Sequence, residues 1–127
     1  MERGARTILY VDDDENQRAG AVKALGPLGC AIATAGDADT ALALIQGDAS
    51  IAALLVCIML TEAEKLVIGA KGHRPELRVV YLTSLPEMML LDREAPGDGL
   101  LLRLPIDPEQ ARAVLAGIVD GPGSPPA

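Results

Sequence analysis

The sequence predicts an α/β fold in which helices cover both faces of a parallel sheet. Short apolar segments alternate with helical patterns five times along the 127 residues. The apolar segments are aliphatic at successive positions, as expected of strands that are buried on both faces. Turns rich in glycine, proline and aspartate separate them. Repeated strand-helix units of this kind join parallel strands through right-handed crossovers.

Each strand and helix can be placed from its own signals. The predicted strands cover residues 8–11, 30–34, 51–57, 78–82 and 100–104. The predicted helices cover about 15–25, 37–47, 61–71, 84–93 and 107–119. We expect the strand order 2-1-3-4-5 of a flavodoxin-like, doubly wound sheet. Residues 1–120 then form one domain, and residues 121–127 form a flexible Pro/Gly tail or a linker stub.

The helix starts carry clear local signals. Asp14 is suited to cap the first helix, and Gln17 follows it in capping-box spacing. Thr61 and Glu64 have the same spacing before the third helix. Asp107 precedes a proline at the first position of the last helix, where proline is favoured.

Composition excludes several classes of function. Half of the residues are hydrophobic, which is enough for a core, and that core is aliphatic because the chain has no Trp or Phe. Acidic residues outnumber Lys and Arg by 18 to 11, so we expect no direct nucleic-acid binding, which needs a basic surface. No apolar run reaches the roughly 18 residues of a membrane span, and no signal region begins the chain. Cys30 and Cys57 are too few for a disulfide framework, and we expect them to lie too far apart to pair. A cytoplasmic location is the expectation.

The most informative segment is the run of four acidic residues, 12–15, after the first predicted strand. Adjacent carboxylates repel one another unless a cation or water screens them. Ligands of open α/β sheets bind beyond the carboxyl ends of the strands. We therefore expect Asp12 and Asp13 to form either a weak cation site or a solvated acidic turn. The residues expected at the same edge are Cys57, Thr83, Ser84, Leu104 and Pro105.

Over about residues 7–119 the chain resembles the receiver domain of two-component response regulators. Residues 8–15, Ile-Leu-Tyr-Val-Asp-Asp-Asp-Glu, resemble the first strand and acidic pair of that family. Residues 34–42 resemble its second strand and helix entry. Residues 79–84, Val-Val-Tyr-Leu-Thr-Ser, resemble its fourth strand, which ends in a hydroxyl. Residues 104–109, Leu-Pro-Ile-Asp-Pro-Glu, resemble the stretch where the family has Lys-Pro before its last helix.

The resemblance implies a phosphotransfer site at this edge. In receivers, an aspartate at the end of the third strand takes a phosphoryl group from a histidine kinase. That aspartate and the acidic pair hold Mg²⁺, and a lysine on the fifth strand pairs with the phosphoryl oxygens. Carried over, the resemblance assigns the metal positions to Asp12, Asp13 and the backbone carbonyl of Met59. It assigns the hydroxyl that follows the phosphoryl group to Thr83 or Ser84.

Four departures from the family pattern fall on this edge. Cys57 stands in place of the acceptor aspartate, Leu104 in place of the lysine and Leu101 in place of the aromatic switch residue. Residues 61–65 lack the usual proline and glycine. A thiol is a poor Mg²⁺ ligand because the ion prefers hard oxygen donors. Arg103 replaces the lysine only if the strand register slips, since adjacent strand residues face opposite sides. We therefore expect no catalytic residue, no enzyme activity and no required cofactor, with Mg²⁺ bound weakly if it binds.

The leading hypothesis is an atypical receiver, or pseudo-receiver, of a two-component phosphorelay that signals by binding a protein. The partner is expected to be a histidine kinase, an output domain or another regulator, with a second copy of the chain as an alternative. The resemblance places the partner face on the fourth helix, the fifth strand and the fifth helix. Its expected residues are Met88, Met89, Leu91, Arg93, Leu101, Arg103 and Arg112.

Three other functions are weaker alternatives. One of the aspartates 12–14 would accept phosphate in place of Cys57, but their geometry suits metal binding. A haloacid-dehalogenase-like phosphatase would use residues 11–14 with Thr83 or Ser84. That reaction needs a catalytic lysine, and no lysine lies near the fourth or fifth strand. A redox switch at Cys57 needs an exposed thiolate, which the acidic surroundings disfavour.

Overall fold

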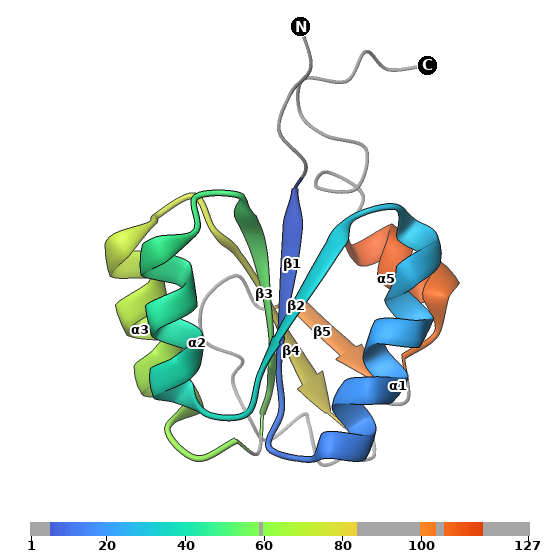
Figure 1. The fold of residues 1–127 in the computed structure, drawn as a ribbon, viewed down its shortest axis with the longest axis horizontal. Helices are drawn as coiled ribbons and strands as arrows, with labels where there is room; N and C mark the ends of the chain where they lie inside the picture. Colours follow the sequence, from blue (N-terminus) through green and yellow to red (C-terminus); the bar gives the residue numbers. More distant parts are fainter. Residues whose placement is uncertain (1–5, 59, 84–99, 104–105, 116–127) are drawn as a thin grey trace, which may run out of the picture.

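The computed structural model describes residues 6–58, 60–83, 100–103 and 106–115, and it contains one five-stranded parallel sheet (Figure 1). The strand order is β2-β1-β3-β4-β5, which confirms the predicted α/β fold and topology. The strands are β1 (Thr7–Val11), β2 (Ala31–Ala35), β3 (Ile51–Cys57), β4 (Arg78–Thr83) and β5 (Leu100–Arg103). The helices are α1 (Glu15–Leu25), α2 (Ala38–Gly47), α3 (Ala63–His73) and α5 (Pro108–Val114), with a short 3-10 helix η1 (Gly26–Leu28).

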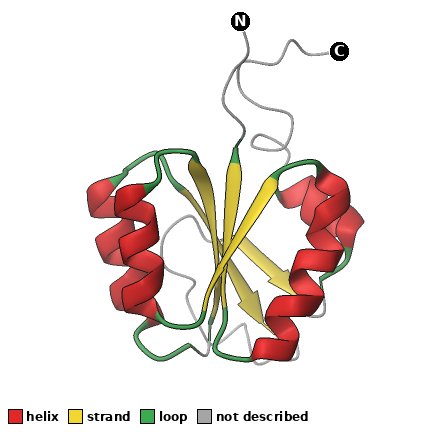
Figure 2. Cartoon of the chain, in the orientation of Figure 1, coloured by secondary structure: helices red, strands yellow, loops and turns green. Residues whose placement is uncertain are grey.

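The helices form two layers, one on each side of the sheet. Helices α2 and α3 lie side by side on one face, and α1 and α5 cover the other (Figures 1 and 2). Each face has its own hydrophobic core, because alternate residues of each strand point to opposite sides. Leu9, Val11 and Tyr81 belong to the core under α2 and α3. Ile8 and Tyr10 belong to the core under α1 and α5.

Parallel pairing brings the carboxyl ends of the strands to one edge. Val11 at the end of β1 is opposite Ala35 of β2 and Val56 of β3. The pairing of β4 with β5 runs in regular register to Thr83 opposite Arg103. The register slip that would let Arg103 replace the missing lysine therefore does not occur within this pair.

Three of the helix starts are capped by an aspartate side chain, and the sequence predicts two of these caps, at Asp14 and Asp107. The carboxylate of Asp14 accepts hydrogen bonds from the backbone N–H groups of Asn16 and Gln17. Asp37 accepts from Thr40 N at the start of α2, and Asp107 accepts from Glu109 N at the start of α5. Each cap satisfies an N–H group that has no partner within its helix.

The predicted start and end of α3 are wrong. Thr61 is not the cap: the residue before the helix is Glu62, in the left-handed region at φ 66°, and its side chain makes no capping bond. Leu60 N donates to Cys57 O and Ala63 N donates to Leu60 O, so backbone turns complete the entry instead. The helix also continues to His73, because Arg74 N donates to Ala70 O and satisfies the last turn.

Several predictions lie outside the described residues. They are the helix over 84–93, residues 116–119 of the last helix, the tail 121–127, and the positions of Met59, Ser84, Leu104 and Pro105. Among the described residues, no helix is long and apolar enough to cross a lipid bilayer. Cys30 and Cys57 form no disulfide, as their separation across β1 predicts.

Candidate functional site

The acidic residues after β1 have three different environments. Asp12 is buried, with 1% of its surface exposed, whereas Asp13 and Asp14 are exposed. Asp14 caps α1, so its carboxylate is committed to the helix. Asp13 lies at the surface, as a solvated acidic turn requires. The fold therefore divides this run into a buried group, a surface group and the helix cap that the sequence predicts at Asp14.

Asp12 is held by neutral hydrogen-bond donors. Its Oδ1 accepts from the backbone N–H of Asp14 at 2.9 Å, and its Oδ2 accepts from the hydroxyl of Tyr10 at 3.1 Å. The backbone N–H of Asp14 is thus bonded to Asp12, in the place where a capping box would use the Gln17 side chain. Burial of a carboxylate is costly unless hydrogen bonds compensate it, and these two donors provide that compensation.

Arg18 secures the backbone of the same residue. Its Nη1 donates to the carbonyl oxygen of Asp12 at 2.6 Å, and Asp12 N donates to Ala35 O at 3.1 Å. The guanidinium lies over Gly36, where a Cβ would stand 3.1 Å from Nη1. Because glycine has no side chain, Gly36 leaves room for the Arg18 guanidinium next to the end of β2.

Tyr10 is the site residue that sequence reasoning missed. Its ring is fully buried in the core under α1 and α5. Burial raises the pKa of its hydroxyl, and the charge of Asp12 and the hydrogen bond to that carboxylate raise it further. The hydroxyl therefore stays protonated and remains a donor. The sequence feature that could have predicted this contact is the spacing of two positions, which places Tyr10 and Asp12 on the same face of β1.

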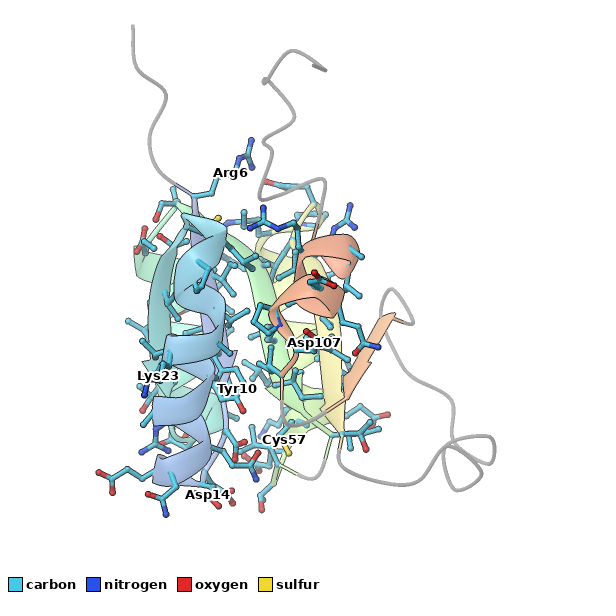
Figure 3. All side chains as sticks on the ribbon, turned by 90° about the vertical axis from the view of Figure 1, so that its right-hand side faces the viewer. Arg6, Tyr10, Asp14, Lys23, Cys57 and Asp107 are labelled. Carbon is cyan, nitrogen blue, oxygen red and sulfur yellow. The ribbon has the colours of Figure 1, made fainter. Side chains whose placement is uncertain are left out.

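Cys57 and Thr83 reach the same edge from the neighbouring strands. Cys57 ends β3 and is half-buried, and its register partner is Leu82 of β4. Thr83 ends β4 and is buried. Figure 3 shows Cys57 and Asp14 near one end of the molecule and Arg6 near the other. The predicted juxtaposition of Asp12, Cys57 and Thr83 at the carboxyl edge is therefore present in the fold.

These side chains do not match a receiver-type Mg²⁺ site. Mg²⁺ prefers six oxygen ligands and keeps several of its waters. Here Asp12 is buried with both oxygens hydrogen-bonded, and Cys57 offers a soft sulfur atom. Within residues 6–58, 60–83, 100–103 and 106–115, no group of three or more His, Cys, Asp or Glu side chains is arranged to hold a metal.

Only part of the predicted partner face falls on described residues. Leu101 and Arg103 lie on β5, which forms one edge of the sheet next to β4. Arg112 is exposed on α5, and its Nη2 donates to the carbonyl oxygen of Pro27 at 3.4 Å. The predicted face residues outside the described ranges are Met88, Met89, Leu91 and Arg93.

No family model and no curated protein matches the chain, but solved structures do. A CheY-like response regulator receiver domain protein from Methanospirillum hungatei JF-1 has a TM-score of 0.73 and 21% identity, over 92% of this chain and 95% of that one. The signal receiver domain of an HD domain-containing protein from Pseudomonas fluorescens Pf-5 has a TM-score of 0.76 and 21% identity, over 92% and 96%.

The receiver domain of the hybrid histidine kinase CckA has a TM-score of 0.68 and 20% identity, over 89% of this chain and 98% of that one. Likeness at this level of identity shows the fold. The chain therefore has the CheY-like receiver fold, as the sequence motifs predict.

Proposed function

We propose that this chain is a receiver-like signalling module of a two-component system that acts by binding a protein and is not phosphorylated on its third strand. The observation that carries the proposal is Cys57 at the carboxyl end of β3. It stands beside Asp12 and Thr83, at the edge where receivers carry out phosphotransfer. This placement supports a receiver-like module whose phosphotransfer edge lacks the acceptor carboxylate.

The chemistry of the substituted residues supports loss of phosphotransfer. A carboxylate can both bind Mg²⁺ and attack phosphorus, whereas a thiol binds Mg²⁺ poorly. Leu104, at the position of the family lysine, offers no charge to stabilise a transferred phosphoryl group. We therefore assign no enzyme activity and no required cofactor to the chain.

Protein binding is the activity that remains for a receiver fold without this chemistry. The solved structures of similar fold include the signal receiver domain of an HD domain-containing protein and the receiver domain of a hybrid histidine kinase. A kinase, an output domain or another regulator is the class of partner that we propose, with a second copy of the chain as an alternative. Arg112 and the β5 edge contribute to the proposed binding face.

Amide NMR tests this function. Spectra are recorded with Mg²⁺ alone and then with Mg²⁺ plus beryllofluoride, a mimic of the phosphoryl group. The control is the Cys57→Asp, Leu104→Lys double variant, which restores the family residues. We expect the native protein to remain unchanged and the variant to shift at Asp13 and Thr83. Shifts of the native protein at these residues would contradict the proposal.

A further inference from the structure

The outer side of β2 is an open edge of the sheet. Among the described residues, β2 pairs with β1 alone and forms the edge opposite β5. Ala31 N donates to Arg6 O, so Ala31 and, two positions on, Ala33 direct their backbone groups toward β1. The N–H and C=O groups of Ile32 and Thr34 therefore point away from β1. The side chain of Thr34 is exposed, which shows that α1 does not cover this part of the strand.

The β2 edge lacks the usual protection against pairing with another strand. Natural edge strands are commonly guarded by charged side chains, by proline or by a bulge. Residues 24–36 contain no Asp, Glu, Lys or Arg, and β2 itself, Ala-Ile-Ala-Thr-Ala, contains no proline. Its register with β1 is regular over all five pairs. An open edge of this kind is suited to strand addition.

The charges at the two ends of β2 favour a second copy of the chain in the antiparallel direction. Arg6 lies beside the start of β2, since Arg6 O accepts from Ala31 N. Exposed Asp37 follows the end of β2, and Arg6 and Asp14 lie near opposite ends of the molecule (Figure 3). Antiparallel pairing therefore brings the basic end of each strand to the acidic end of the other. The net charge of −7 opposes association elsewhere on the surface, whereas this stretch is neutral.

We propose that two copies of the chain associate by antiparallel pairing of their β2 strands around a two-fold axis at Ala33, the middle residue of the strand. Ile32 of each copy then exchanges two backbone hydrogen bonds with Thr34 of the other, and the two Ala33 residues form the non-hydrogen-bonded pair between them. The interface is isologous, so it closes at two copies. It does not use β5 or α5, and the inference therefore goes beyond the proposed function and does not rest on it.

Disulfide cross-linking tests the register. In a Cys30→Ser, Cys57→Ser background, Ala33→Cys places two thiols across the axis. Facing residues of a non-hydrogen-bonded antiparallel pair have Cα atoms about 4.5 Å apart, which a disulfide can span. Ala31→Cys is the matched control: position 31 is more exposed than position 33, but its counterpart lies roughly 13 Å away along the partner strand.

We expect a glutathione redox buffer to link Ala33→Cys at least about tenfold faster than Ala31→Cys, because only the former pair lies within the Cα separation of a disulfide. Electrophoresis without reductant measures the linked fraction. Random collision would favour the more exposed position 31. Equal rates, or faster linking of Ala31→Cys, would therefore overturn the inference.

Sedimentation velocity of the reduced protein over a concentration series tests the association itself. Thr34→Pro removes an N–H that points away from β1, so two hydrogen bonds are lost from each dimer. The dissociation constant is expected to rise about tenfold or more. Thr34→Val keeps the N–H and should leave this constant within about threefold.

A native chain that stays monomeric at every concentration, or equal dissociation constants for Thr34→Pro and Thr34→Val, would contradict the inference. If circular dichroism shows that Thr34→Pro does not fold, the comparison of Ala33→Cys with Ala31→Cys decides the question. The beryllofluoride experiment tests the proposed function separately, so either idea can fail while the other stands.

Discussion

Tyr10 and Tyr81 lie on opposite faces of the same sheet, and their hydroxyls have opposite hydrogen-bonding states. The Tyr10 hydroxyl donates to Asp12. The Tyr81 hydroxyl is buried and has no hydrogen-bond partner within the described residues. The two side chains are equally buried, with at most 1% exposed. They are therefore a matched pair for measuring what one buried hydroxyl contributes to this fold.

Removal of the two hydroxyls should change stability in opposite directions. Tyr10→Phe leaves a buried carboxylate with one donor fewer and is expected to lower the free energy of unfolding by about 1–3 kcal/mol. Tyr81→Phe removes an unpaired polar group and is expected to raise it by up to about 1 kcal/mol. Urea denaturation at pH 7 measures both. A loss of stability in Tyr81→Phe as large as that in Tyr10→Phe would show that both hydroxyls are bonded in solution.

Stability should also fall at alkaline pH through Tyr81. Burial raises the pKa of Tyr81 from 10.0 to about 12, and the charge of Glu64 adds to this. The folded state holds the Tyr81 proton more tightly than the unfolded state does. The resulting contribution to the free energy of unfolding is therefore complete below pH 10 and is lost as the pH rises to about 12. Denaturation curves across that range should show a smaller decrease for Tyr81→Phe than for the native protein. Parallel decreases in both proteins would rule out this role for Tyr81.

Arg74 should be important for stability although it lies far from the acidic edge in the fold. Its guanidinium donates to Ile51 O at 2.8 Å and to Ile45 O at 2.6 Å, which joins the last turn of α2 to the start of β3. Arg74→Ala is expected to lower the free energy of unfolding by about 2–4 kcal/mol. Two charge-assisted hydrogen bonds of about 1.5–3 kcal/mol each are lost, and relaxation of the structure offsets part of this loss. Lys65→Ala serves as a control: its ion pair with Glu62 is exposed at 3.9 Å, so about 0.5 kcal/mol or less is expected. Equal effects of the two substitutions in thermal or urea unfolding would contradict this assignment.

Gly36 and Arg18 should be energetically coupled. A Cβ at position 36 would lie 3.1 Å from Arg18 Nη1, so Gly36→Ala is expected to displace the guanidinium from Asp12 O and cost about 1 kcal/mol. In an Arg18→Ala background the same substitution should change the free energy of unfolding little, and a double-mutant cycle measures this difference.

Gly20→Ala is a control substitution in α1. A Cβ at position 20 would meet nothing within 4 Å, so this substitution should raise the free energy of unfolding by about 0.5–1 kcal/mol. Additive effects of the substitutions at positions 18 and 36 would mean that the arginine is not held where the structure places it.

The thiol of Cys57 should react slowly, which tests the redox alternative. The side chain is half-buried at the end of β3, which limits the access of a reagent to its sulfur atom, and reactive cysteines are at least partly exposed. Labelling of the native protein at pH 7, followed by mass spectrometry, should be much slower than labelling in urea. A Cys57→Ser variant identifies the label that belongs to Cys30. Native labelling of Cys57 as fast as in urea would favour a redox switch.

The sequence predicted the fold well because its signals are local and repeated. The strand run 51–57 was predicted with the observed bounds, since an uninterrupted aliphatic segment ends at an abrupt change in composition. The helix α1 was likewise predicted from Asp14 to Leu25 because a cap and a Gly-Pro break mark its ends. The start of α3 was predicted wrongly because Thr61 carries a capping pattern, while the backbone at Glu62 adopts a left-handed conformation that no local pattern signals.

The candidate site was predicted only in outline. Parallel strand ends must meet at one edge, so the grouping of Asp12, Cys57 and Thr83 followed from the strand assignments alone. The cap at Asp14 was predicted from its position before the helix, but the burial of Asp12 beside an exposed Asp13 could not be predicted, since it depends on packing and on the reach of the Tyr10 ring. Those properties arise from packing between distant segments and not from residue spacing.

The bond between Tyr10 and Asp12 has a consequence for how such a module could carry information. A receiver that recruits an ion and a phosphoryl group changes its state with the chemistry around it. In this chain the donors to Asp12 come from residues 10–14 themselves, so that carboxylate is satisfied from the moment the domain folds. On the function proposed above, the state of this edge would not depend on a transferred phosphoryl group.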